Sequence, residues 1–132
     1  MANHDQLKLI KEGVETWNAW RKANPSIRVD LSSGNLSGMH LSGVDLEGAD
    51  LQDVNFNNAD LSEAMMSGAN LTESSLMEAD LTGATLINAN VSDADLLKVI
   101  LVRANLEHDQ VVQDRIADFR VIDLLILFRH RF

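Results

Sequence analysis

The sequence contains no cysteine and no tyrosine among its 132 residues. Without cysteine there is no disulfide framework and no thiol chemistry. Aromatic residues make up only 5% of the chain, which argues against a stacking platform for single-stranded nucleic acid. No glycine-rich phosphate loop is present, and none of the four histidines pairs with a carboxylate at a catalytic spacing. We therefore expect a protein that is not an enzyme and that binds no cofactor and no metal.

Long apolar segments are also missing. The longest unbroken apolar run, Leu124 to Phe128, is far too short to span a bilayer. The segment from Met1 to Gln6 is polar and lacks the apolar core of a signal peptide. These two features lead us to expect a soluble, cytoplasmic protein without membrane contact.

The sequence does contain a repeat of five residues. A large apolar residue stands at every fifth position, sixteen times without insertion or deletion: Leu31, Leu36, Leu41, Leu46, Leu51, Phe56, Leu61, Met66, Leu71, Leu76, Leu81, Leu86, Val91, Leu96, Leu101 and Leu106. Two residues before each of them stands a mostly small residue, alanine in nine of the units. Such a fixed short period indicates a repeat architecture.

A period of five fits neither regular helix nor simple strand. In an α-helix each five-residue step would rotate the leucines by roughly 140°, so no core stripe would form. A strand alternates its faces with a period of two. We expect instead a short extended piece followed by a bend in every unit. Four bends close a circuit of twenty residues, and residues 29–108 then make four stacked coils, about 19 Å tall at the usual strand spacing.

The tandem Ala-Asp/Asn-Leu-x-x units, clearest at 59–63, 69–73 and 79–83, resemble the pentapeptide repeat family. Residues 17–21 and the following Asn24-Pro25 are similar to the amino-terminal segment of some cyanobacterial members. The resemblance implies an all-β solenoid, a right-handed quadrilateral β-helix of about four coils, but no single function. Departures from the consensus at residues 65, 66, 74 and 75 are expected to loosen one corner.

The two ends differ from the repeat. Residues 1–28 predict a helical cap over the β-helix of residues 29–108. Apolar residues from Leu7 to Trp17 share one helical face, Asp5 can cap the start, and Asn24-Pro25 ends the helix. Trp17 and Trp20 are expected to cover the first coil. An aromatic ligand pocket is the alternative for these two rings.

Residues 109–132 predict a carboxyl-terminal cap or dimerisation segment, which fits either a helix or a phase-shifted further coil. Outward residues of the last coil are apolar, and the segment after them is richer in apolar residues than a lid requires. We expect a homodimer, as in the gyrase-inhibiting members of the family, with the tail folding onto the last coil as the alternative. The expected contact residues are Leu97, Ile100, Val102, Leu124, Leu125 and Phe128.

The recurring polar residues and glycines of the repeat are interpreted as turn residues and not as catalytic or metal-binding ones. An Asp or Asn before the central residue of most units is expected to bond the backbone at the bends. The glycines at the corner position, such as Gly38 and Gly48, are expected to supply positive φ.

Charge is concentrated in the repeat. Residues 29–108 hold thirteen acids and two bases, a net charge of −11, which disfavours direct binding to nucleic acid. Residues twenty apart stack in columns, and one face carries Asp50, Asp53, Glu73 and Asp93. We expect this acidic face to bind a protein partner, so that the protein serves as an interaction scaffold. The alternative is a DNA mimic that inhibits or protects DNA gyrase, a type II topoisomerase.

Overall fold

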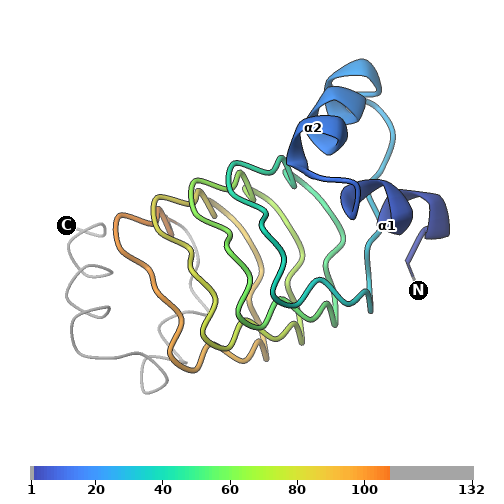
Figure 1. Cartoon of the computed structure of the whole chain (residues 1–132). Coiled ribbons are helices and arrows are strands. Elements are labelled where there is room, and N and C mark those ends of the chain that lie inside the picture. The colour runs from blue at the N-terminus through green and yellow to red at the C-terminus, as the bar shows by residue number, and fades with distance from the viewer. Residues whose placement is uncertain (1, 108–132) are drawn as a thin grey trace.

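The computed structural model describes residues 2–107, which form a coiled tube with two helices at one end (Figure 1). Helix α1 spans His4–Ile10 and helix α2 spans Val14–Ala23. From Asp30 onward, single residues twenty positions apart form parallel bridges, the first Asp30 with Asp50 and the last Thr85 with Asn105. Twenty residues therefore make one coil. We call residues 29–48, 49–68, 69–88 and 89–107 coils 1 to 4, and the successive five-residue segments of each coil sides one to four.

Backbone hydrogen bonds join each coil to the next. The Leu51 N–H donates to the Asn70 carbonyl at 2.7 Å, and the Asn70 N–H donates to the Ala49 carbonyl at 2.9 Å. Each bridge involves one residue, and within residues 2–107 no longer strand or continuous sheet forms, because the chain bends again after each bridge. The predicted bend every five residues and the twenty-residue circuit are confirmed.

Each bend is a tight turn that begins at the central residue of a unit. The Val54 N–H, for example, donates to the Leu51 carbonyl at 3.2 Å, and Asp53 between them has a φ of 59°. The expected positive φ of the corner glycines is confirmed, with Gly38 at 67° and Gly48 at 65°. The same conformation also occurs at ten residues that are not glycine, which the sequence analysis did not predict: Ser33, Asp53, Asn58, Glu63, Glu73, Glu78, Asn88, Asp93, Lys98 and Arg103.

The core fills the inside of the tube. The central apolar residue of every unit is buried, and so is nearly every residue two positions before it. The expected loosening at residues 65, 66, 74 and 75 is wrong: Met66 and Ser74 are buried, and Met65 and Ser75 bridge to the following coil as their neighbours do. An unbranched methionine fits a leucine position, and serine is as small as the alanine it replaces. The Ser74 hydroxyl has no hydrogen-bond partner within the described part of the chain.

The amino-terminal cap consists of two helices, so the expectation of one helix is wrong. Gly13, at a φ of 121°, separates α1 from α2 in a conformation that L-residues rarely adopt. Asn3, not Asp5, caps α1, since its side-chain oxygen accepts the Gln6 N–H at 3.1 Å. Asp5 lies in the first turn of α1, where its charge favours the positive end of the helix dipole.

The predicted covering of the first coil is confirmed. Ile10 of α1 and Trp17 of α2 are fully buried in one core cluster with the solenoid, and Leu7, Val14 and Trp20 pack against it. Neither helix of residues 2–107 is long and apolar enough to cross a membrane. The predictions for residues 109–132 lie outside the described residues.

Candidate interaction surface

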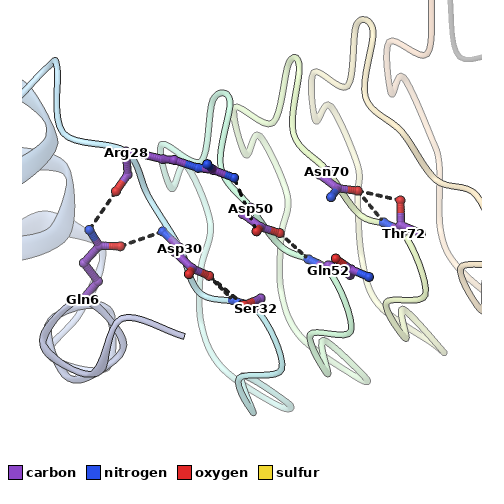
Figure 2. A network of polar contacts seen from close by, with 8 residues as sticks. All are labelled: Gln6, Arg28, Asp30, Ser32, Asp50, Gln52, Asn70 and Thr72. Carbon is purple, nitrogen blue, oxygen red and sulfur yellow. Dashed lines mark hydrogen bonds and ion pairs between the residues drawn. The ribbon is translucent and has the colours of Figure 1, made fainter. Parts of the chain in front are cut away.

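The Asp and Asn side chains before the central residues bind their own turns. In each case Oδ1 accepts the backbone N–H two residues further on, as in the Asp50–Gln52 and Asn70–Thr72 pairs of Figure 2, both at 3.1 Å. A serine or threonine two residues on adds its hydroxyl, so that Asn70 also accepts the Thr72 hydroxyl at 2.6 Å. The structural interpretation of these residues is confirmed for all eleven of them: Asp30, Asn35, Asp45, Asp50, Asn55, Asp60, Asn70, Asp80, Asn90, Asp95 and Asn105.

These turn hydrogen bonds change the acidity of two carboxyls. The Ser62 hydroxyl and then the Ser62 backbone N–H lower the pKa of Asp60, and the nearby His40 adds to this effect. The Ser32 hydroxyl and backbone N–H lower the pKa of Asp30 in the same way. Both groups therefore keep their charge to a lower pH than an ordinary aspartate does, because hydrogen bonds to the charged form stabilise it.

The acidic face is a column of corner residues beside one residue of side one. Asp53, Glu73 and Asp93 occupy the same corner in coils 2, 3 and 4, all with exposed side chains and positive φ. Asp53 accepts the hydroxyl of Ser33, the residue above it in coil 1, at 3.1 Å. The structure thus brings these three predicted residues together on the surface.

Asp50 has a different environment from the other three. It is half-buried on side one, its Oδ2 lies 3.7 Å from Nη2 of Arg28, and its Oδ1 is occupied by the turn (Figure 2). Within residues 2–107 no group of three or more ligating side chains could hold a metal ion. The face therefore offers fixed negative charge along three coils, concentrated at the corner.

The predicted dimer contact is only partly described. Leu97 and Val102 are 47% and 36% exposed, and Ile100 between them is half-buried. All three lie on coil 4, at the end of the tube away from the helices (Figure 1). Leu124, Leu125 and Phe128 lie outside the described residues.

The aromatic ligand pocket is not formed. Trp17 is fully buried, its ring N–H donates to the Asp45 carbonyl at 2.8 Å, and its ring centre lies 5.2 Å from that of Trp20. A groove of about 510 Å³ does lie between α2 and side four, lined by Asn18, Arg21, Lys22, Pro25, Asp45, Glu47 and Met65. Five of its seven lining residues are polar or charged, and neither tryptophan is among them.

Side chains of the cap bind the exposed edge of coil 1, which the sequence analysis missed. The Gln6 amide donates to the Arg28 carbonyl at 2.9 Å and accepts the Asp30 N–H at 2.7 Å (Figure 2). Asn18 does the same where side three meets side four, donating to the Gly43 carbonyl and accepting the Asp45 N–H. Each side-chain amide therefore replaces the backbone of a preceding coil.

Two further cap residues bind the same edge on side four. Trp17 donates to the Asp45 carbonyl and Arg21 to the Glu47 carbonyl, both at 2.8 Å. Arg21 also lies 3.5 Å from the Asp45 carboxylate, while its Nε has no partner among the described residues. These edge-binding cap residues could have been identified from the sequence as polar residues on the helix face that must cover the end of the solenoid.

Comparison with known proteins places this geometry in a family. Pentapeptide repeats, in eight copies, match residues 27–62, 40–76 and 74–108. A pentapeptide repeat protein from the cyanobacterium Cyanothece 51142 is 41% identical with a TM-score of 0.60, over 61% of this chain and 54% of that one. One from the thylakoid lumen of Arabidopsis thaliana is 31% identical with a TM-score of 0.59, over 66% and 64%.

A third solved structure, a pentapeptide repeat protein from Nostoc Pcc 7120, is 34% identical with a TM-score of 0.46, over 73% of this chain and 77% of that one. No curated protein matches the sequence. The chain spans between about half and two thirds of the length of the first two structures. By its repeats and its likeness to the first two structures, this chain belongs to the pentapeptide repeat family and has its fold, a β-helix, behind two amino-terminal helices.

Proposed function

We propose that this protein is a non-enzymatic scaffold that binds a protein partner through its acidic face. The observation that carries the proposal is the exposed column of Asp53, Glu73 and Asp93. Like charges on neighbouring coils repel, and at about 4 Å in water each such pair costs roughly 1 kcal/mol. A column that weakens the stack yet recurs in three coils is accounted for by a partner that supplies positive charge.

The fold supports this proposal because the column is held at fixed positions. Every corner is closed by its own turn hydrogen bond, and the Asp53 and Glu73 N–H groups donate to the next coil at 3.0 and 2.9 Å. Complementary charges of this kind contribute mainly to association rate and specificity. A partner with Lys or Arg side chains about 4.8 Å apart would match the column.

Charge reversal tests the proposal. Protein carrying Asp53→Lys, Glu73→Lys and Asp93→Lys should lose a partner that the unchanged protein captures from native lysate. The matched control, Glu63→Lys, Glu78→Lys and Glu107→Lys, makes the same change in net charge elsewhere on the coils and should keep that partner. Equal capture by both triple variants would reject the acidic face as the binding surface.

The DNA mimic remains the alternative proposal, and the same column is the feature that favours it. Inhibition or protection of gyrase supercoiling by micromolar protein, lost in the acidic-face variant, would support the mimic over the scaffold. No effect on supercoiling at that concentration rejects it.

We further propose that the coil is right-handed and quadrilateral and that the protein is cytoplasmic. We also propose that it forms a homodimer through its carboxyl-terminal end. The exposed Leu97 and Val102 support the dimer. Sedimentation should then show a dimer at tens of micromolar protein, and Leu97→Lys should shift it to monomer, whereas Met65→Lys, an equally apolar exposed residue on coil 2, should not. A monomer in the unchanged protein would refute the dimer.

A further inference from the structure

The helices pair with only half of the edge of coil 1. On sides one and four they bind both N–H groups and three of the four carbonyls that face away from coil 2, through Asn3, Gln6, Trp17, Asn18 and Arg21. On sides two and three, no residue within 2–107 binds the N–H groups of Asn35 and His40. The carbonyls of residues 35, 37, 40 and 42 are likewise unpaired within that range. We call residues 35–42 the open edge.

The same groups are fully paired one coil further on. There the Asn55 and Asp60 N–H groups donate to the Gly34 and Met39 carbonyls, both at 2.9 Å. The carbonyls of residues 55, 57, 60 and 62 each accept an N–H from coil 1 at 2.8 to 2.9 Å. A chain lying along the open edge in the manner of a preceding coil would therefore gain six main-chain hydrogen bonds.

The open edge is accessible. Asn35, Ser37, His40 and Ser42 are all exposed. In coil 2, Asn55 and Asp60, which correspond to Asn35 and His40, are half-buried beneath coil 1. A groove of about 300 Å³ lies between α1 and the first corner and reaches Gly34, the residue before the edge; it is lined by Ala2, His4, Leu7, Ser32, Ser33 and Gly34. The groove leaves no room for a side chain at position 34, because a Cβ added to Gly34 would lie 2.9 Å from the Leu7 side chain.

The two coils at the open edge carry negative charge, whereas residues 1–28, which include the cap, hold three acids and five bases. Residues 29–68, which form coils 1 and 2, contain seven acids and no Lys or Arg. Asp60 lies in the column directly below His40, and Asp53 and Glu63 stand at the corners on either side. A chain that adds to this edge therefore meets negative charge on the side of the coils.

We propose that the open edge is a docking site for a basic peptide segment of a partner protein, which lies parallel to residues 35–42 and bends with them at Gly38, as a preceding coil would. Main-chain hydrogen bonds to a strand edge supply affinity irrespective of side chain, and the flanking carboxylates select for Lys or Arg. This site shares Asp53 with the acidic face, but its main-chain hydrogen bonds come from backbone groups of coil 1 and do not require the column of Asp53, Glu73 and Asp93.

A synthetic peptide tests the proposal directly. A blocked eight-residue peptide of alternating Lys and Thr should shift the amide NMR signals of Asn35 and His40 saturably and slow their hydrogen exchange. The same peptide with every backbone nitrogen methylated has no N–H donor and should cause neither change, and an alternating Glu and Thr peptide should bind at least tenfold more weakly. Absence of shifts at millimolar Lys–Thr peptide would overturn the proposal.

His40→Pro provides the matched variant, because it removes an N–H that binds nothing within residues 2–107 and so spares the fold. It should weaken peptide binding about tenfold, the effect of one lost hydrogen bond with its partner left unpaired. His40→Ala keeps the N–H and should bind as the unchanged protein does. Equal peptide binding by both variants would overturn the proposal. Concentration-dependent self-association that His40→Pro abolishes would also overturn it, because the ligand of the open edge would then be a second copy of this chain.

Discussion

At the scale of single residues, the third position of each turn determines how much local strain the solenoid holds. Glycine occupies it at Gly38, Gly43 and Gly48, whereas Glu73 and Glu78 adopt nearly the same φ with a full side chain. The left-handed region costs an L-residue roughly 1–2 kcal/mol relative to its preferred conformations. Several units of this solenoid are therefore less stable than a glycine-rich repeat would be.

Glu73→Gly should raise the free energy of unfolding by about 0.5–1 kcal/mol, since the relief of positive φ outweighs the greater freedom of glycine in the unfolded chain. Denaturant titration measures the change. Glu73→Ala removes the same charge but keeps the strained φ, and should stabilise less. Equal stabilisation by both variants would assign the gain to charge instead.

Ser62→Ala should raise the pKa of Asp60 towards its ordinary range, because the hydroxyl hydrogen bond is the largest cause of the depression. A carboxyl with a depressed pKa stabilises the fold above its unfolded pKa and loses that contribution as the pH falls through the folded one. The variant should therefore be less stable than the unchanged protein at neutral pH, with the difference shrinking in acid.

NMR titration of the Asp60 carboxyl against pH checks this. Ser67→Ala is the control. Ser67 stands two residues after Met65, as Ser62 stands two residues after Asp60, but Met65 has no carboxylate. This variant should leave the pKa of Asp60 unchanged. A pKa of Asp60 that stays depressed in Ser62→Ala would contradict the assigned cause.

At the scale of elements, the helices matter as the replacement for a missing coil. Gln6 shows this best, since it is buried and both ends of its amide bind coil 1. Ile10 and Trp17 cover the apolar interior, while the amides and the Arg21 guanidinium bind the backbone edge. The cap thus performs two tasks with different side chains.

Gln6→Leu should lower the free energy of unfolding by about 2 kcal/mol or more, since it leaves the Arg28 carbonyl and the Asp30 N–H unpaired beneath α1. Urea titration followed by circular dichroism provides the measurement. Gln52→Leu, an exposed residue whose side chain makes no hydrogen bond within residues 2–107, should change stability by less than about 0.5 kcal/mol. If both variants unfold alike, Gln6 does not hold the cap.

The elements also show what can be predicted from sequence. The five-residue period determines which side chains face inward, because only one bend frequency buries every central residue, and the Asp and Asn positions follow from the turns. The break at Gly13 was missed because Leu7 to Trp17 keep one apolar face across both helices. The edge contacts of Gln6 and Asn18 depend on where the helices lie on coil 1, and a one-dimensional period does not contain that placement.

The candidate surface was also predicted only in part from the sequence. Stacking of residues twenty apart predicted the column of Asp53, Glu73 and Asp93, since it follows from the circuit length alone. The ion pair between Arg28 and Asp50 was not predicted, because Arg28 precedes the repeat and its position depends on the cap. The open edge likewise could not be predicted from sequence, since it is the part of coil 1 that the two helices leave uncovered.

At the scale of the whole molecule, the repeat carries a net charge of −11 on a short tube. Self-repulsion of this kind destabilises a compact state and is screened by salt, with a Debye length of about 10 Å at 0.1 M. Raising sodium chloride from about 0.01 M to 0.5 M should therefore raise the melting temperature. Asp53→Asn, Glu73→Gln and Asp93→Asn together should reduce that salt dependence, and an unchanged dependence would show that the column does not contribute to it.

The coiled tube requires residues twenty apart to lie side by side. The hydroxyls of Ser42 and Ser62 are 3.0 Å apart on neighbouring coils, and the chain has no cysteine of its own. In Ser42→Cys with Ser62→Cys, mild oxidation should form an intramolecular disulfide in nearly all molecules, seen by mass as the loss of two hydrogens. Ser42→Cys with Ser67→Cys, one side further along the coil, should stay reduced. Failure of the first pair to close, or equal closure of both pairs, would contradict the twenty-residue coil.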